Sequence, residues 1–297
     1  MDWLILLSLV RLFFYFGVFS FMGYVAMLGL FNKHAIQINP FTSENGLMGW
    51  LWCSFFISLA GMTAVVPLNA GMLLDEGLSG VIDPLMLQLV WNSAIGEQTL
   101  ARGIALSLVL VILIWINQRK RQGGSSALVF SVLFTSAVIG WSFTRSGHSA
   151  TTSLAAQLCI ALHVMMAGWW IGSLYPLIRL SRTEHAKALQ LALQAYGKQA
   201  AVWVGILLMS GGILLTLLLL NVSSTVNNVY LWVMAAKLTL VCGMLCFAAY
   251  HKWKLVGRIE TRQDCIAVRK SITAEALIGV LVLMVTATLS NSIGIAD

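Results

Sequence analysis

The chain has few charged residues, which excludes an ordinary soluble protein. Only 10% of its 297 residues are Asp, Glu, Lys or Arg, whereas 59% are hydrophobic. Soluble globular proteins carry about 25% charged residues. Strict alternation of apolar and polar residues, the pattern of a transmembrane β-barrel, is also missing. The composition therefore predicts an all-α, polytopic membrane protein.

Apolar runs of about twenty residues recur along the chain, and each is long enough to cross the hydrocarbon layer. They predict one integral-membrane domain over residues 1–297, a helical bundle with about eight transmembrane helices. The glycines of the first, fifth and sixth runs predict close helix contacts. The predicted spans are about 3–30, 47–74, 97–117, 126–144, 153–179, 197–220, 229–250 and 273–293.

The first span lacks a basic leading region and a small-residue cleavage pattern, so we expect it to stay in the mature protein. The five cysteines are odd in number, and four of them lie inside apolar spans. They do not predict a disulfide framework. Inside a membrane such thiols are packing residues or soft metal ligands.

Basic residues fall on one side of the predicted bundle. By the positive-inside rule this side faces the cytoplasm, so both termini face the periplasm. The net charge of +7 follows from this asymmetry and does not indicate a nucleic-acid partner; the lipid bilayer is the predicted surrounding. The basic residues of that side are Lys33, Arg119, Lys120, Arg121, Arg179, Arg182, Lys187, Lys198, Lys252, Lys254, Arg258, Arg262, Arg269 and Lys270.

A few ionisable side chains lie within the spans, where they are costly and often functional. Arg11 and Lys237 lie in the predicted outer half, where long side chains can also reach the headgroups. Glu275 lies near the cytoplasmic end of the last span, where Arg269 or Lys270 could pair with it.

His163 is predicted near the middle of the membrane, in the run LCIALHVMMAGWW (158–170). Cys159, His163, Met166 and Trp170 share one helix face at spacings of four, three and four. Thiolate, imidazole and thioether are ligands that Cu(I) selects. The pattern predicts a copper ion, with Cu(I) favoured, although the same residues could simply pack. Cys242 and Cys246 form a second pair at helical spacing.

Catalytic motifs such as HExxH, a P-loop or GxSxG are missing, and no soluble segment is long enough to house chemistry. We therefore do not expect an enzyme.

Several segments together resemble the CopD/PcoD family of bacterial inner-membrane copper-resistance proteins. The strongest is Gly147-His148 followed by HVMMAGWWIGSLYP (163–176). VRLFFYF (10–16), AAKLTLVCGMLCFAAYHKWKL (235–255) and AEALIGVLVL (274–283) are similar to three further family spans. The sequence departs from the family at Ile160, where many members carry His or Asp, and at His251-Lys252, where they carry Asn-Arg.

The resemblance implies a multi-pass inner-membrane protein that moves copper, often beside a periplasmic CopC-type copper-binding partner. His148 would receive copper at the outer side, and His163 with Cys159 and Met166 would hold it in the membrane. Transfer toward Cys242, Cys246 and His251 would follow. Cys159 could take the place of the family ligand that Ile160 replaces.

Two other functions remain open at this point. Arg11 and Lys237 place positive charge where a copper pathway should not have it, and they would suit an anionic cofactor such as b-type haem, or a quinone. Helical haem sites take two axial His or Met ligands, and His163 is the one histidine predicted near the middle of the membrane. The third hypothesis is a non-transporting membrane protein that docks a periplasmic copper chaperone.

Overall fold

The computed structural model describes residues 2–34, 46–75, 77–118, 126–145, 153–182, 186–221 and 228–292. These residues are almost entirely helical and contain no strand. The α-helices are α1 (Trp3–His34), α2 (Gly46–Leu74), α3 (Leu78–Val81), α4 (Pro84–Trp91), α5 (Ala94–Gln118), α6 (Ser126–Ser142), α7 (Leu154–Leu180), α8 (Ala186–Asn221), α9 (Asn228–Tyr250) and α10 (Arg262–Ser292).

Eight of these helices are long and apolar enough to cross a membrane, which confirms the predicted number. The chain is a multi-pass membrane protein. Two helices begin well before the apolar runs that predicted them, α8 at Ala186 and α10 at Arg262. Strong helix formers fill these polar extensions, so the backbone stays helical beyond the apolar part.

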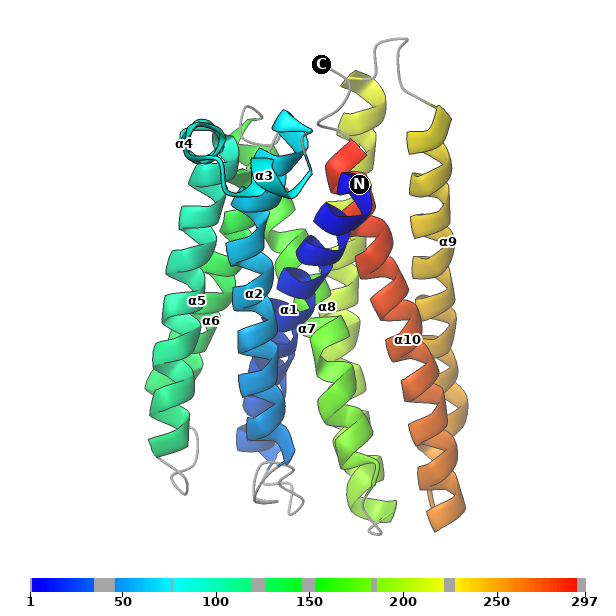
Figure 1. The fold of residues 1–297 in the computed structure, drawn as a ribbon. Helices are drawn as coiled ribbons and strands as arrows, with labels where there is room; N and C mark the ends of the chain where they lie inside the picture. The colour runs from blue at the N-terminus through cyan, green and yellow to red at the C-terminus, as the bar shows by residue number, and fades with distance from the viewer. Residues whose placement is uncertain are drawn as a thin grey trace.

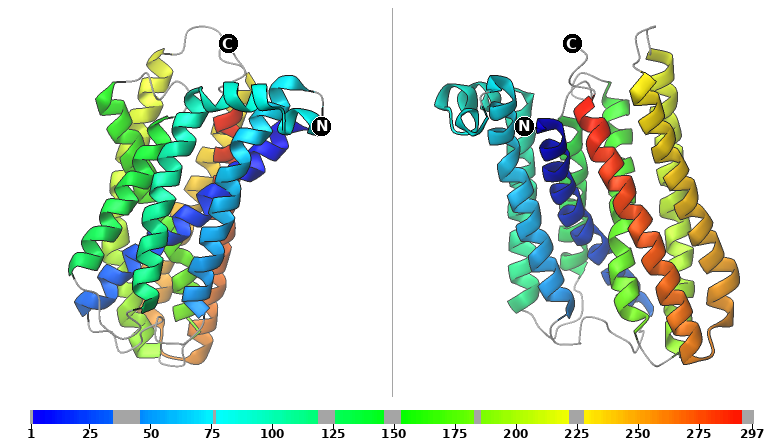
Figure 2. Two further views of the ribbon diagram at one scale, coloured as in Figure 1. Left: turned by 60° about the vertical axis from the view of Figure 1, so that its left-hand side comes forward. Right: turned by 45° about the vertical axis from the view of Figure 1, so that its right-hand side comes forward.

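The long helices form a bundle in which α1 crosses between its neighbours (Figures 1 and 2). α1 packs against α2, α7 and α10. At its crossing with α7, a Cβ on Gly23 would collide with the backbone of Gly172, and a Cβ on Gly172 with the carbonyl of Phe19. These glycines therefore let two backbones touch, as small residues do between membrane helices.

Buried side chains form two main clusters on the two sides of the bundle. One joins α1, α2, α5 and α6 through aromatic and aliphatic residues. The other joins α7, α8, α9 and α10. Residues of α7 contribute to both clusters, so α7 links the two sides.

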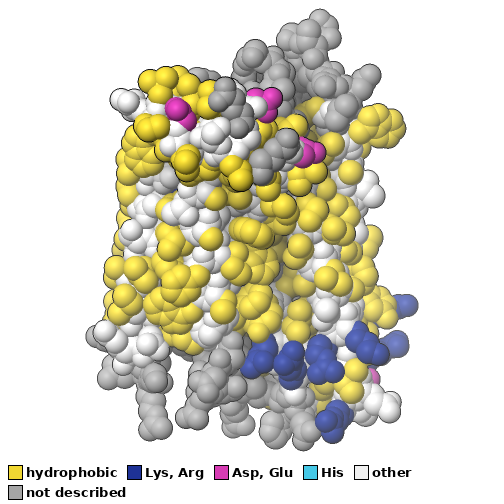
Figure 3. Space-filling view, viewed as in Figure 1, with side chains coloured by type: hydrophobic (Ala, Val, Ile, Leu, Met, Phe, Trp, Pro, Cys, Tyr) yellow, Lys and Arg dark blue, Asp and Glu magenta, His cyan; other side chains and the backbone are white. Residues whose placement is uncertain are grey.

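Charge is distributed unevenly along the bundle axis. α1 begins and α10 ends at the same end (Figure 1), as an even number of crossings requires. Acidic side chains are visible at that end, and Lys and Arg side chains gather near the opposite end, below α7 to α10 (Figure 3).

The segment after α2, expected as a loop, contains the short helices α3 and α4. Asp83 caps α4 by accepting a hydrogen bond from the backbone N–H of Met86 at 2.8 Å, and Pro84 occupies the first helical position. Both features are typical of a helix start. The indole of Trp3 donates to Asp75 at 3.1 Å and ties this segment to the beginning of α1.

Candidate functional site

His163 lies on the side of α7 that faces α8. Its Nδ1 lies 3.2 Å from the carbonyl oxygen of Leu207 and 3.4 Å from the hydroxyl of Ser210. Gly211 makes this approach possible, because a Cβ there would lie only 2.9 Å from Cε1 of the imidazole. The glycine of α8 therefore holds the ring against the backbone of that helix.

The contact with Leu207 determines which ring nitrogen carries the proton. A carbonyl oxygen only accepts hydrogen bonds, so Nδ1 donates and Nε2 is left with a free lone pair. Among the described residues Nε2 has no hydrogen-bond partner. Histidines that bind metals commonly use this arrangement, with the second nitrogen donating to a carbonyl.

The face that carries His163 continues toward the basic end of the bundle. Met166 is buried in the cluster of α7 to α10, and Cys159 is half-buried. Trp170 donates from Nε1 to Glu275 Oε1 of α10 at 3.0 Å. The predicted stripe thus contacts two different helices, because His163 faces α8 and Trp170 faces α10.

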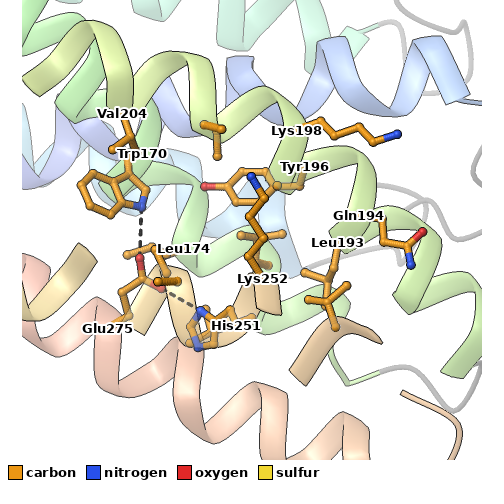
Figure 4. Close-up of a pocket in the computed structure, with 18 of the residues that line it drawn as sticks. Trp170, Leu174, Leu193, Gln194, Tyr196, Lys198, Val204, His251, Lys252 and Glu275 are labelled. Atoms are coloured by element: carbon orange, nitrogen blue, oxygen red, sulfur yellow. Dashed lines mark hydrogen bonds and ion pairs between the residues drawn. The ribbon is translucent and has the colours of Figure 1, made fainter. Parts of the chain in front are cut away.

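Glu275 is the centre of a buried polar network and is only 2% exposed. Its Oε2 lies 3.1 Å from Nδ1 of His251, and Nε2 of His251 lies 2.6 Å from the hydroxyl of Ser271 (Figure 4). Glu275 therefore pairs with His251 and Trp170, whereas the sequence suggested Arg269 or Lys270. Both nitrogens of His251 are occupied in this arrangement.

His251 begins a single π-helical turn, His251–Leu255, which follows α9 and leads into a 3₁₀ turn, Val256–Arg258. π-helical turns inside helices are frequent at functional sites. Here the turn places His251 and Lys252 beside a pocket of about 450 Å³. Trp170 and Glu275 line the same pocket (Figure 4).

The remaining predicted copper ligands are not brought together in the part of the chain that the structure describes. Cys242 and Cys246 are exposed on α9. No three His, Cys, Asp or Glu side chains of the described ranges converge on one point. His148 lies outside the described residues. Any copper site must therefore use few ligands from these side chains, together with Met or residues outside the described ranges.

Comparison with protein families gives one match. The family model CopD, described as copper resistance protein D, matches residues 190–289. The match covers residues 190–289 of the 297-residue chain, and over this segment the chain is similar to the CopD family. The searches of curated proteins and of solved structures found no match.

The CopD segment runs from the first turns of α8 through α9 to α10. It contains Lys237, Cys242, Cys246, His251 and Glu275, and it also supplies the Leu207 carbonyl that orients His163. His163 itself and Arg11 lie outside the segment. The site around His163 therefore joins a helix outside the CopD match to a helix inside it.

Arg11, on the N-terminal side of the CopD segment, contacts α10 close to the end of that helix. Its Nη1 donates to the carbonyl oxygen of Ser290 at 2.6 Å and to the Ser290 hydroxyl at 2.8 Å. Lys237 lies within electrostatic range of His163. Arg11 is thus bound to α10, whereas Lys237 lies on α9 near His163.

Arg102 of α5 is a buried cation that the sequence analysis missed. It is only 2% exposed, and its guanidinium lies 4.4 Å from the ring centre of Phe14 and 5.4 Å from that of Phe143. Such cation–π contacts stabilise a desolvated cation. Arg102 lies five residues after Glu97, near the beginning of the predicted span 97–117, and the sequence analysis did not single it out. The aromatic residues around Phe14 were the feature of the sequence that could have indicated a buried cation nearby.

Proposed function

We propose that this chain is a bacterial inner-membrane protein that carries copper across the membrane, with copper as its cargo. Its similarity to the CopD family over residues 190–289 supports a role in copper resistance. The eight apolar helices are the architecture that an ion pathway through a membrane needs. The proposal assigns no enzymatic step to the chain.

The observation that carries the proposal is the orientation of His163. Its Nδ1 is engaged by the Leu207 carbonyl, and its Nε2 lone pair is available to a metal ion. On α7, Met166 lies about one helical turn after His163, and Cys159 lies about one turn before His163. Imidazole, thioether and thiol together favour Cu(I) over harder cations.

The route we propose begins at His148 on the periplasmic side and continues to His163 with Cys159 and Met166. Transfer toward Cys242, Cys246 and His251 completes it. For His251 to take part, its Nε2 must exchange the Ser271 hydroxyl for copper, while Glu275 keeps hold of Nδ1. A carboxylate that holds the second nitrogen would strengthen a histidine as a ligand.

In this proposal both termini face the periplasm, and the basic end of the bundle faces the cytoplasm. A periplasmic CopC-type protein would then deliver or receive copper at the end where α3 and α4 lie.

The experiment is a Cu(I) titration of the detergent-purified protein against a chromophoric chelator, for the wild type and His163→Ala. We expect about one equivalent bound by the wild type, and loss of at least tenfold in affinity in the variant. Met166→Ala should weaken binding, whereas Met209→Ala, an exposed methionine on α8, should not. Cys159→Ser has its matched control in Cys53→Ser on α2.

A b-type haem carrier is the second candidate, because Arg11, Arg102 and Lys237 are cations within the membrane spans and the described residues offer them no carboxylate partner. An absorption spectrum of the same preparation distinguishes the two candidates. A Soret band that persists in His163→Ala would favour haem held elsewhere. Retained binding of a CopC-type protein, without copper or haem, would favour a docking role.

A further inference from the structure

The pocket beside His251 opens sideways between two helices. α9 packs along α10 but, over the described residues, makes little contact with α8. It is also the least buried of the eight candidate spans. The pocket of about 450 Å³ extends inward from this opening to α7 and α10. It can therefore be entered from the hydrocarbon layer.

The walls of the pocket between α8 and α9 include several small or aliphatic side chains. Ala201 and Val204 of α8 face Leu245, Ala248 and Ala249 of α9 across it. This apolar part of the lining favours a hydrocarbon chain over a polar solute, because these side chains offer no hydrogen bonds.

Lys198 and Lys252 are the two cations that line the pocket (Figure 4). Both side chains are exposed. Lys198 is the last charged residue before a long apolar stretch of α8, and Lys252 is the first Lys or Arg after the apolar stretch of α9. They therefore lie at one level, where the hydrocarbon layer ends.

Exposed aromatic residues are independent evidence that the hydrocarbon layer ends near Lys252. Trp253 is 78% exposed and Tyr250 is 47% exposed, next to Lys252. Trp and Tyr gather where hydrocarbon meets headgroups. The same end of the bundle carries the surface band of Lys and Arg in Figure 3, and basic pockets between helices on the cytoplasmic side are known to bind anionic headgroups.

The carboxylate of Glu275 also lines the pocket, and it would repel an anion placed beside it. Its two oxygens are, however, engaged by Trp170 and His251. Glu275 is also only 2% exposed, whereas Lys198 and Lys252 are exposed. An anion at the mouth would meet the lysines first.

We propose that this crevice binds one anionic glycerophospholipid of the surrounding leaflet. An acyl chain enters between α8 and α9, and the phosphate lies between the ammonium groups of Lys198 and Lys252. The lipid would fill the space that α9 leaves beside α8. His251 and Glu275 also line this pocket, but the proposed phosphate contacts use only Lys198 and Lys252.

The test is native mass spectrometry of the full-length protein in detergent with phosphatidylglycerol or phosphatidylcholine added. We expect the wild type to retain phosphatidylglycerol at least tenfold more strongly. Lys198→Gln with Lys252→Gln should weaken phosphatidylglycerol about 25-fold, about fivefold for each ammonium group near the headgroup. Lys187→Gln, at the start of the same helix α8 but outside the pocket, is the charge control.

A second pair of variants tests the acyl chain. Ala249→Phe fills the opening and should reduce the binding of both lipids, whereas Ala236→Phe, exposed on α9 outside the pocket, should leave it unchanged. Equal binding of the two lipids by the wild type would overturn the proposal. So would unchanged phosphatidylglycerol binding in the lysine variant, a neutral quinone occupying the crevice, or a dimer of the chain that closes it.

Discussion

The two sides of the bundle differ in how their helices meet. α1, α2, α5 and α6 are joined by aromatic rings and by glycines at backbone distance, and they bury Arg102 with no carboxylate partner among the described residues. α8, α9 and α10 surround a pocket, a π-helical turn and the Glu275 network. The family match covers the second side. The comparison indicates that the first side is a rigid frame, and that the second side has the space for ligands.

The largest effect is expected where the frame meets α7. Gly23→Leu would drive a side chain into the backbone of Gly172, so α1 and α7 would have to move apart. We expect a loss of about 3 kcal/mol or more in stability, which can abolish folded protein. Thermal unfolding in detergent measures it.

Gly212→Leu on α8 is the matched control, because nothing lies within 4 Å of a Cβ at that position. An equal loss of stability in Gly23→Leu and Gly212→Leu would contradict the close packing of α1 on α7.

The next effect concerns the buried cation of the frame. Arg102→Ala removes a side chain that is only 2% exposed and leaves a cavity between aromatic rings, so we expect a loss of about 3 kcal/mol. Arg102→Met fills the same space without a charge, and it should stay within about 1 kcal/mol of the wild type. Thermal unfolding of both variants in the same detergent separates the contribution of the side-chain volume to stability from that of the positive charge.

Equal destabilisation by alanine and by methionine would show that the charge itself is required. An anion bound by Arg102 would then explain the requirement, and the haem candidate would gain support.

The smallest effect is expected on the open side. Glu275→Gln keeps an acceptor for Trp170 but weakens the contact with His251, so we expect a loss of about 1 kcal/mol. Trp170 lies beside the changed group, and a change in tryptophan fluorescence should accompany the loss. Glu260→Gln, at an exposed position before α10, is the control.

A loss above about 3 kcal/mol in Glu275→Gln would contradict the comparison. It would mean that the polar network, rather than the glycine and aromatic packing of the frame, is the main support of the bundle.

The eight spans could be predicted from the sequence because each is a long apolar run, and hydrocarbon requires its backbone to be helical. The beginnings of α8 and α10 could not be predicted in this way, because hydropathy marks the part of a helix that lies in the membrane and not its polar extension. The close contacts predicted from Gly17, Gly23, Gly168 and Gly172 are confirmed. The contact predicted from Gly211 is confirmed too, with His163, but the one predicted from Gly212 is not, because a Cβ there would have nothing within 4 Å.

The candidate site was harder to predict. The stripe on α7 was readable from helical spacing, but which neighbour each residue faces depends on how α7 is rotated. The partner of His163 is a backbone carbonyl, which leaves no mark in the sequence. The contact of His251 with Glu275 joins α10 to the π-helical turn His251–Leu255, and hydropathy does not predict a π-helical turn.

The central claim is that Nε2 of His163 binds copper. X-ray absorption of the Cu(I)-loaded wild type and His163→Ala tests it most directly, because the two samples differ by one imidazole. The account predicts a nitrogen neighbour of copper together with sulfur in the wild type, and loss of that nitrogen in the variant. An unchanged copper environment in His163→Ala would contradict the claim.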